Sequence, residues 1–173
     1  MGAAARRIAA DPNARVRRVV DENSPLTEQR GSPALAAPAA LIAAIAGGLA
    51  WGLIVKWTGY EVGIIAWGIG FLTGTAAVLA TRGGKGAVLQ GIAIVTALLG
   101  ILLGKYLSYA FDVQDQATEA GVSLGLFSGD MRSFFREDLD QVFGLFDLLW
   151  VGFAVYTAWR VPRQQGPELT PGP

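Results

Sequence analysis

Hydrophobic residues along this chain fall into four long blocks separated by polar segments. The blocks run over about 35–57, 60–80, 87–111 and 142–159. A bilayer core about 30 Å thick needs about 20 apolar residues in a helix, and each block is close to that length. The pattern predicts an all-α membrane protein, a four-transmembrane-helix bundle.

The connections between the blocks are short, with one exception. Residues 57–59 and 81–86 allow only tight turns, whereas residues 112–141 form a sizeable loop that we expect outside the membrane. From Asp130 onward, apolar residues recur every three to four positions, which predicts an amphipathic surface helix over roughly 130–140 that bends into the fourth span. Ser128, Gly129 and Asp130 supply its N-terminal cap.

The ends of the chain are predicted to be tails of the membrane domain. Residues 1–34 form a basic tail broken by Pro12, Pro25 and Pro33, which we expect to be largely disordered, residues 35–160 form the transmembrane domain, and residues 161–173 form a second tail. Basic residues concentrate in both tails and in the 81–86 turn, while the 112–141 loop holds seven acidic residues. The positive-inside rule then predicts a multi-pass protein with both termini in the cytoplasm.

Composition removes several classes of function. The chain has no cysteine and no histidine, which excludes disulfides, thiolate metal sites and histidine-ligated haem or zinc. We predict no catalytic residues, cofactor or metal, because no nucleophile–base pair or ligand set is evident. The zero net charge predicts no nucleic-acid partner.

Glycine spacing predicts close helix packing. Four pairs match the GxxxG pattern, in which small residues four apart let another backbone approach closely. We expect most of these faces to pack inside the molecule and leave a homo-oligomer as the alternative use of some. The pairs are Gly48/Gly52, Gly59/Gly63, Gly70/Gly74 and Gly100/Gly104.

Two ionisable residues lie clearly inside the predicted spans, where a charge is costly and usually has a partner. Lys105 lies six residues before Phe111, where the third block ends, and Asp147 lies six residues after Gln141, near which the fourth begins. Equal depth and opposite sign predict a pair, and Glu61 and Lys56 flank the first outer turn and extend the cluster. This cluster is interpreted as a structural ion pair, a solute or ion pathway, or a contact with another subunit or a lipid headgroup.

Four short segments carry a resemblance over roughly residues 40–160. The segments 59–63, 66–70, 104–106 and 147–150 read GYEVG, AWGIG, GKY and DLLW. They resemble a family of small bacterial four-helix membrane proteins, some members of which carry a zinc ribbon before the helices. This chain has no cysteine, so no zinc site carries over. The resemblance implies a fold and a bacterial inner membrane, and it supplies no activity.

The expected function is therefore that of a non-enzymatic accessory or scaffold protein. Its expected partners are the lipid bilayer and either further copies of itself or a larger membrane complex. The alternative is a small transporter or channel that uses Lys105, Asp147 and Glu61. A transporter requires a water-accessible cavity that reaches Asp147, whereas a scaffold requires these charges to be enclosed and an apolar face to be left free.

Overall fold

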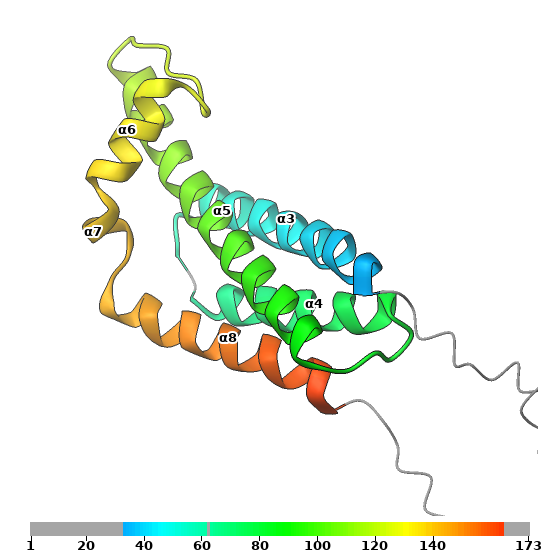
Figure 1. Cartoon of the computed structure of the whole chain (residues 1–173). Helices are drawn as coiled ribbons and strands as arrows, with labels where there is room; N and C mark the ends of the chain where they lie inside the picture. The colour runs from blue at the N-terminus through cyan, green and yellow to red at the C-terminus, as the bar shows by residue number, and fades with distance from the viewer. Residues whose placement is uncertain (1–32, 62, 165–173) are drawn as a thin grey trace, which may run out of the picture. The chain divides into compact units, whose positions relative to one another are not determined.

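The computed structural model describes residues 33–61 and 63–164, and among these residues it contains helices and no strand. The all-α class predicted from the sequence is therefore confirmed. Helix labels follow Figure 1. The helices are α3 (Pro33–Thr58), α4 (Ile64–Ala80), α5 (Ala87–Glu119), α6 (Gly129–Glu137), α7 (Leu139–Val142) and α8 (Leu145–Gln164).

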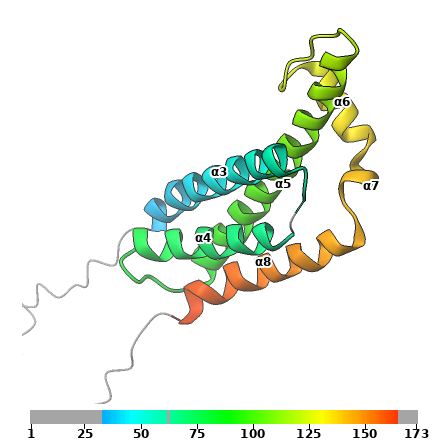
Figure 2. The same cartoon turned by 180° about the vertical axis from the view of Figure 1, so that it is seen from behind.

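The four long helices pack so that α4 and α5 lie between α3 and α8. Helix α3 packs mainly on α5, and α4 packs mainly on α8. Figures 1 and 2 show α3 and α8 on opposite sides of this bundle, while α5 extends beyond the other helices and α6 folds back beside its end. The predicted tails covered residues 1–34 and 161–173, of which 1–32 and 165–173 lie outside the described residues. Residues 33–34 belong to α3 and residues 161–164 to α8, so both helices extend into the predicted tails.

Helix α5 is longer than the sequence predicted. It continues to Glu119, about two turns past the expected end at Phe111, because residues 112–119 are mostly polar but contain no glycine or proline. Gly121 then ends the helix with a positive φ of 76°. The Val122 N–H donates to the Ala117 carbonyl and the Gly121 N–H to the Thr118 carbonyl, which is a Schellman ending.

Helix α8 begins at Leu145, so the surface helix does not bend directly into it as the sequence predicted. Phe143 is extended, with φ −110° and ψ 98°, and separates α7 from α8. Helix α6, over Gly129–Glu137, does begin where it was predicted, and the Ser128 side chain accepts a hydrogen bond from the Met131 N–H. The expected loop is therefore partly helical: the end of α5, then α6 and α7.

The interior has two parts. One is made almost wholly of alanine from all four long helices, and the other contains larger residues around Trp51. The first cluster is Ala36, Ala40, Ala77, Leu89, Ala93, Ala97 and Ala158. The second is Trp51, Val55, Ala66, Ile69, Ile101 and Ala154.

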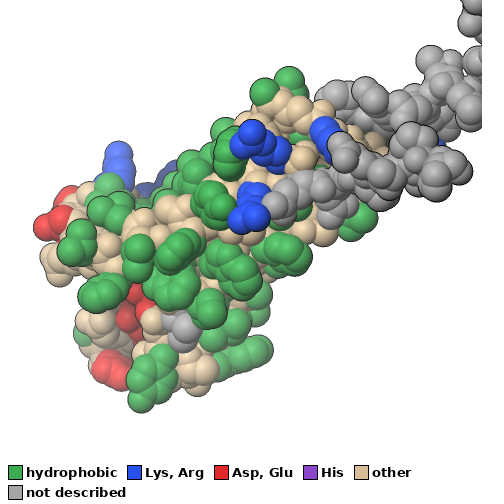
Figure 3. All heavy atoms as spheres, turned by 90° about the horizontal axis from the view of Figure 1, so that it is seen from below, with side chains coloured by type: hydrophobic (Ala, Val, Ile, Leu, Met, Phe, Trp, Pro, Cys, Tyr) green, Lys and Arg blue, Asp and Glu red, His purple; other side chains and the backbone are tan. Residues whose placement is uncertain are grey.

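The outward faces of the long helices are also apolar. Figure 3 shows hydrophobic side chains across the middle of one face, basic side chains toward both ends, and acidic side chains toward one end only. Residues Ala34–Thr58 and all of α5 are long and apolar enough to cross a membrane, and α4 is a shorter apolar helix. Length and composition therefore support a membrane association of this protein.

Candidate functional site

The centre of the site is the ammonium group of Lys105, whose side chain is only 1% exposed. Its Nζ lies 2.8 Å from Glu61 Oε1 and 2.8 Å from Asp147 Oδ1. It also donates a hydrogen bond of 3.0 Å to the Val142 carbonyl. A lysine ammonium has three N–H groups, so every donor of Lys105 has an acceptor. The buried charge is therefore both paired and hydrogen-bonded, as burial requires.

Four elements deliver these groups. Lys105 comes from the middle of α5, Glu61 from the link between α3 and α4, Val142 from the end of α7, and Asp147 from the first turn of α8. The second carboxylate oxygen of Asp147, Oδ2, accepts the Gly144 N–H at 2.8 Å. This is half of a capping box, so the carboxylate that binds Lys105 also caps the start of α8.

Lys105 and Asp147 are in contact, as their equal depth predicted, but α5 ends later and α8 begins later than the apolar blocks indicated. Asp147 is at the start of α8 and not six residues inside it, and Lys105 is about four turns before the end of α5. The two meet because residues 120–144 run back along the C-terminal half of α5 before α8 begins. Figure 1 shows this path from α5 through α6 and α7.

Side chains of α5 fix the returning segment. Tyr106 donates from its hydroxyl to the Leu126 carbonyl at 2.7 Å, and Tyr109 donates to Asp138 Oδ2 at 2.6 Å. The Phe135 ring packs edge-on against both tyrosines, with centroid distances of 5.0 and 5.6 Å. Sequence reasoning missed these contacts; the spacing of Tyr106 and Tyr109, one helical turn apart, was the available signal.

Aromatic rings surround the ammonium. Its Nζ lies 5.9 Å from the centroid of Trp51 and 5.7 Å from that of Phe143, within the range of cation–π attraction. Trp51 is 1% exposed, and its Nε1 has no hydrogen-bond partner among the described residues. Sequence reasoning did not place Trp51 or Phe143 in the site.

Lys56, the fourth residue of the predicted cluster, lies elsewhere. Its Nζ is 4.5 Å from the centroid of the Phe111 ring, and the two ion pairs of Lys105 are with Glu61 and Asp147. The cluster in the structure is therefore Lys105 with Glu61 and Asp147.

A polar cavity of about 310 Å³ adjoins the cluster on the Glu61 side. Glu61 is 43% exposed, whereas Asp147 is 19% exposed and does not line this cavity. The other polar residues of the wall are Ser108, Tyr109, Asp112, Asp138 and Gln141. The cavity therefore reaches Lys105 but not the carboxylate that a transport path was expected to reach.

The glycines of the predicted motifs pack within the molecule, except for one. A Cβ at Gly59 would meet no atom within 4 Å, so this glycine makes no close helix contact. Its positive φ of 68° instead allows the turn after α3. Gly63 faces the Trp150 ring. Between α3 and α5 lie Gly48, Gly52, Gly100 and Gly104, and between α4 and α8 lie Gly70 and Gly74.

The carboxylates do not form a metal site: within residues 33–61 and 63–164, no group of three acidic side chains could hold an ion. Between Glu61 and Asp147, the ammonium of Lys105 takes the place that a cation would otherwise occupy.

The chain matches no protein-family model, no curated protein and no solved structure. What the site does is therefore argued from its geometry.

Proposed function

We propose that this protein is a four-span integral membrane protein that acts as a non-enzymatic scaffold or accessory subunit. The observation that carries the proposal is the enclosure of Lys105. Its side chain is 1% exposed, and its ammonium is bonded to three acceptors from three different segments. A group bound in this way has no free donor for a substrate, and it fixes α5, α8 and the first link relative to one another.

The exposed apolar surface supports the membrane part of the proposal. Large apolar side chains are exposed on all four long helices, including Ile42 on α3, Leu79 on α4, Val95 on α5 and Leu148 on α8. Soluble monomers rarely expose contiguous apolar patches of more than a few hundred Å². Apolar side chains that face lipid tails are not exposed to water, so such a surface is compatible with a membrane environment.

Helix lengths are compatible with four spans. Helix α4 has 17 residues and α8 has 20, and spanning helices range from about 17 to 25. Arg82, Lys85, Arg160 and Arg163 lie at one end of the bundle, and the acidic residues after Phe111 lie at the other. This charge distribution and the resemblance to bacterial four-helix membrane proteins favour the inner membrane, with both termini in the cytoplasm.

Single cysteines test the orientation, because the chain contains none of its own. We expect Ser123→Cys to react with a membrane-impermeant thiol reagent in intact cells, and Ala87→Cys to react only after lysis. Both positions are exposed. Labelling of Ala87→Cys but not Ser123→Cys in intact cells would reverse the proposed orientation.

Photo-crosslinking tests the scaffold role. A photoreactive residue is placed at Ile42, on the outer face of α3, or at Phe153, on the outer face of α8, in the source cell membrane. A scaffold gives one discrete protein adduct from one of these faces, whereas a face that contacts only lipid gives none. Absence of any discrete adduct, together with a monomeric mass in mild detergent, would overturn the scaffold role.

The polar cavity favours one alternative, a small transporter or channel. Asp112, Asp138 and half-exposed Glu61 give its wall an acidic character that suits a cation. Ion flux into vesicles that contain the purified protein, abolished by Glu61→Gln and retained by the Glu119→Gln control, would favour this alternative over the scaffold.

A further inference from the structure

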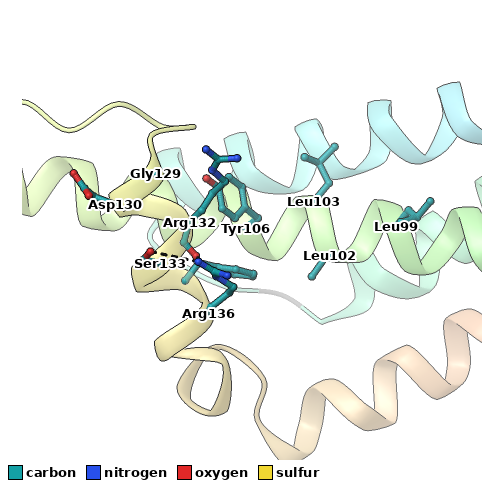
Figure 4. Close-up of a pocket in the computed structure, with 10 residues that line it drawn as sticks. Leu99, Leu102, Leu103, Tyr106, Gly129, Asp130, Arg132, Ser133 and Arg136 are labelled. Atoms are coloured by element: carbon teal, nitrogen blue, oxygen red, sulfur yellow. Dashed lines mark hydrogen bonds between the residues drawn. The ribbon is translucent and has the colours of Figure 1, made fainter.

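A groove of about 870 Å³ lies between α5 and α6, away from the lysine cluster. Leu99, Leu102 and Leu103 of α5 line one part of it, and Arg132 and Arg136 of α6 line another. Figure 4 shows the leucines following one another along α5, and the two arginines on α6 beside Tyr106. The volume lies within the range of about 300–1,000 Å³ that is usual for ligand pockets.

Within the part of the chain that the structure describes, the two arginines form no ion pair with an acidic side chain. Arg132 donates from Nε to the Ser128 carbonyl, and Arg136 donates from Nε to the Arg132 carbonyl and from Nη2 to Ser133 Oγ. The ion pairs found among residues 33–61 and 63–164 are those of Lys105, so neither guanidinium is neutralised there. Like charges four residues apart on a helix repel each other. An anion between them would remove this repulsion.

The leucine part of the groove is suited to a hydrocarbon chain. Leu99 is 49% exposed and Leu102 is 44% exposed, and both belong to the apolar outer face of α5 that also carries Val95 and Leu98. From Leu99 to Tyr106 the helix rises about 10 Å. Apolar surface along the helix and paired cations at one end match the two chemically different parts of a phospholipid.

We propose that this groove binds one anionic phospholipid. Its phosphate lies between Arg132 and Arg136, because a guanidinium binds phosphate oxygens through two parallel hydrogen bonds. One acyl chain lies along Leu99, Leu102 and Leu103. The proposal rests on the membrane location proposed above. Asp130 also lines the groove, but Figure 4 shows it at the end away from the leucines.

Native mass spectrometry of the full chain, delipidated in mild detergent, tests the proposal. Phosphatidylglycerol is compared with zwitterionic phosphatidylcholine of the same acyl chains. A cation near a charged lipid surface contributes about fivefold in affinity, so two arginines give a preference of about 30-fold. We expect Arg132→Gln/Arg136→Gln to lose this preference and to keep the weaker binding of phosphatidylcholine.

A matched control separates the groove from general charge attraction. Lys85→Gln/Arg163→Gln removes the same charge from exposed positions at the other end of the bundle. We expect this variant to keep the preference. Equal loss in both double variants, or no preference in the wild-type chain, would overturn the proposal.

The apolar part of the groove has its own test. Leu102→Trp fills the space beside the arginines, whereas Leu98→Trp changes a similarly exposed residue of the same helix that does not line the groove. We expect only Leu102→Trp to weaken phosphatidylglycerol binding, by tenfold or more. Equal effects of the two would mean that the headgroup binds without the groove.

The outcomes distinguish this proposal from the broader one. Failure of the chain to stay in membranes after alkaline carbonate extraction would remove the membrane function and the lipid site together. Stable insertion without a lipid preference would remove the lipid site alone. A dimer mass that disappears in Leu102→Trp would assign the groove to a second copy of the chain.

Discussion

The two ends of the helix bundle are held together by different kinds of contact. At the end near residues 81–86, the core consists of alanines that are almost completely buried, such as Ala40, Ala77 and Ala97. At the other end, bulky Trp51 packs beside a buried lysine and its two carboxylates. The first end depends on small side chains that let backbones approach, and the second depends on polar groups with specified partners.

This difference sets how each end responds to change. The alanine end has few polar side chains, and its threonines bond within their own helices; Thr81, for example, donates to the Ala77 carbonyl at 2.8 Å. A substitution there acts through volume. At the charged end, removal of one group leaves others without partners, because Lys105 is shared by three acceptors. A substitution there acts through charge and hydrogen bonding.

The largest expected effect is at the charged end. Lys105→Met leaves Asp147 and Glu61 without their common cation, and breaking a buried ion pair typically costs about 3–5 kcal/mol. Glu61 is 43% exposed and can turn toward water, so we expect a value near the lower limit. Unfolding of the purified chain in mixed detergent micelles measures the loss.

The double variant Lys105→Met/Asp147→Leu sharpens this test. We expect it to recover part of the stability lost by either single variant, since the charge of half-exposed Glu61 is then the one member of the cluster left without its partner. Asp147→Asn is the control for capping, because its side-chain oxygen still accepts the Gly144 N–H. Strictly additive losses would mean that Lys105 and Asp147 do not stabilise each other.

The contrast between the ends also explains what the sequence could predict. Helices α3, α4 and α5 followed from uninterrupted apolar blocks, and the small-residue contacts followed from glycines such as Gly48 and Gly70, since both signals are local. The contact between Lys105 and Asp147 was predicted from their equal depth in two apolar blocks, although α5 and α8 do not end and begin where those blocks do. Its actual basis is the return of residues 120–144 along α5, which depends on Tyr106 and Tyr109 and has no local pattern.

The next largest effect is expected at the alanine end. Ala40→Leu adds three carbons at a position that is 0% exposed, and overpacking of this kind typically costs about 1–3 kcal/mol. Ala46→Leu is the matched control on an exposed position of the same helix. Detergent unfolding should show a loss of about 2–3 kcal/mol for the first variant and little change for the second. Equal stability of the two would mean that the alanine contacts are loose.

A smaller effect is expected where α4 meets α8. In Gly70→Ala the new Cβ would lie 2.7 Å from the Ala154 Cα, so the two backbones must separate. The better helix propensity of alanine offsets about 1 kcal/mol of this cost, which leaves a net loss of about 1–2 kcal/mol. Gly68→Ala has nothing within 4 Å of the new atom and should be neutral or stabilising. The same unfolding assay compares them, and a stable Gly70→Ala would show that this contact is able to relax.

The smallest effect is expected in α6, which belongs to the charged end but lies outside the four-helix core. Ser128→Ala removes the acceptor of the Met131 N–H, and loss of an N-cap typically costs about 1 kcal/mol. Met131 and Phe135 remain buried against α5, so the helix should stay in place and open more often. Amide exchange over residues 131–135 should therefore accelerate about fivefold, while exchange in α3 and α4 should not change.

Ser123→Ala, at an exposed position before the helix, is the control. Faster exchange around the alanine cluster would show that the two ends are coupled through α5 and are not independently stabilised.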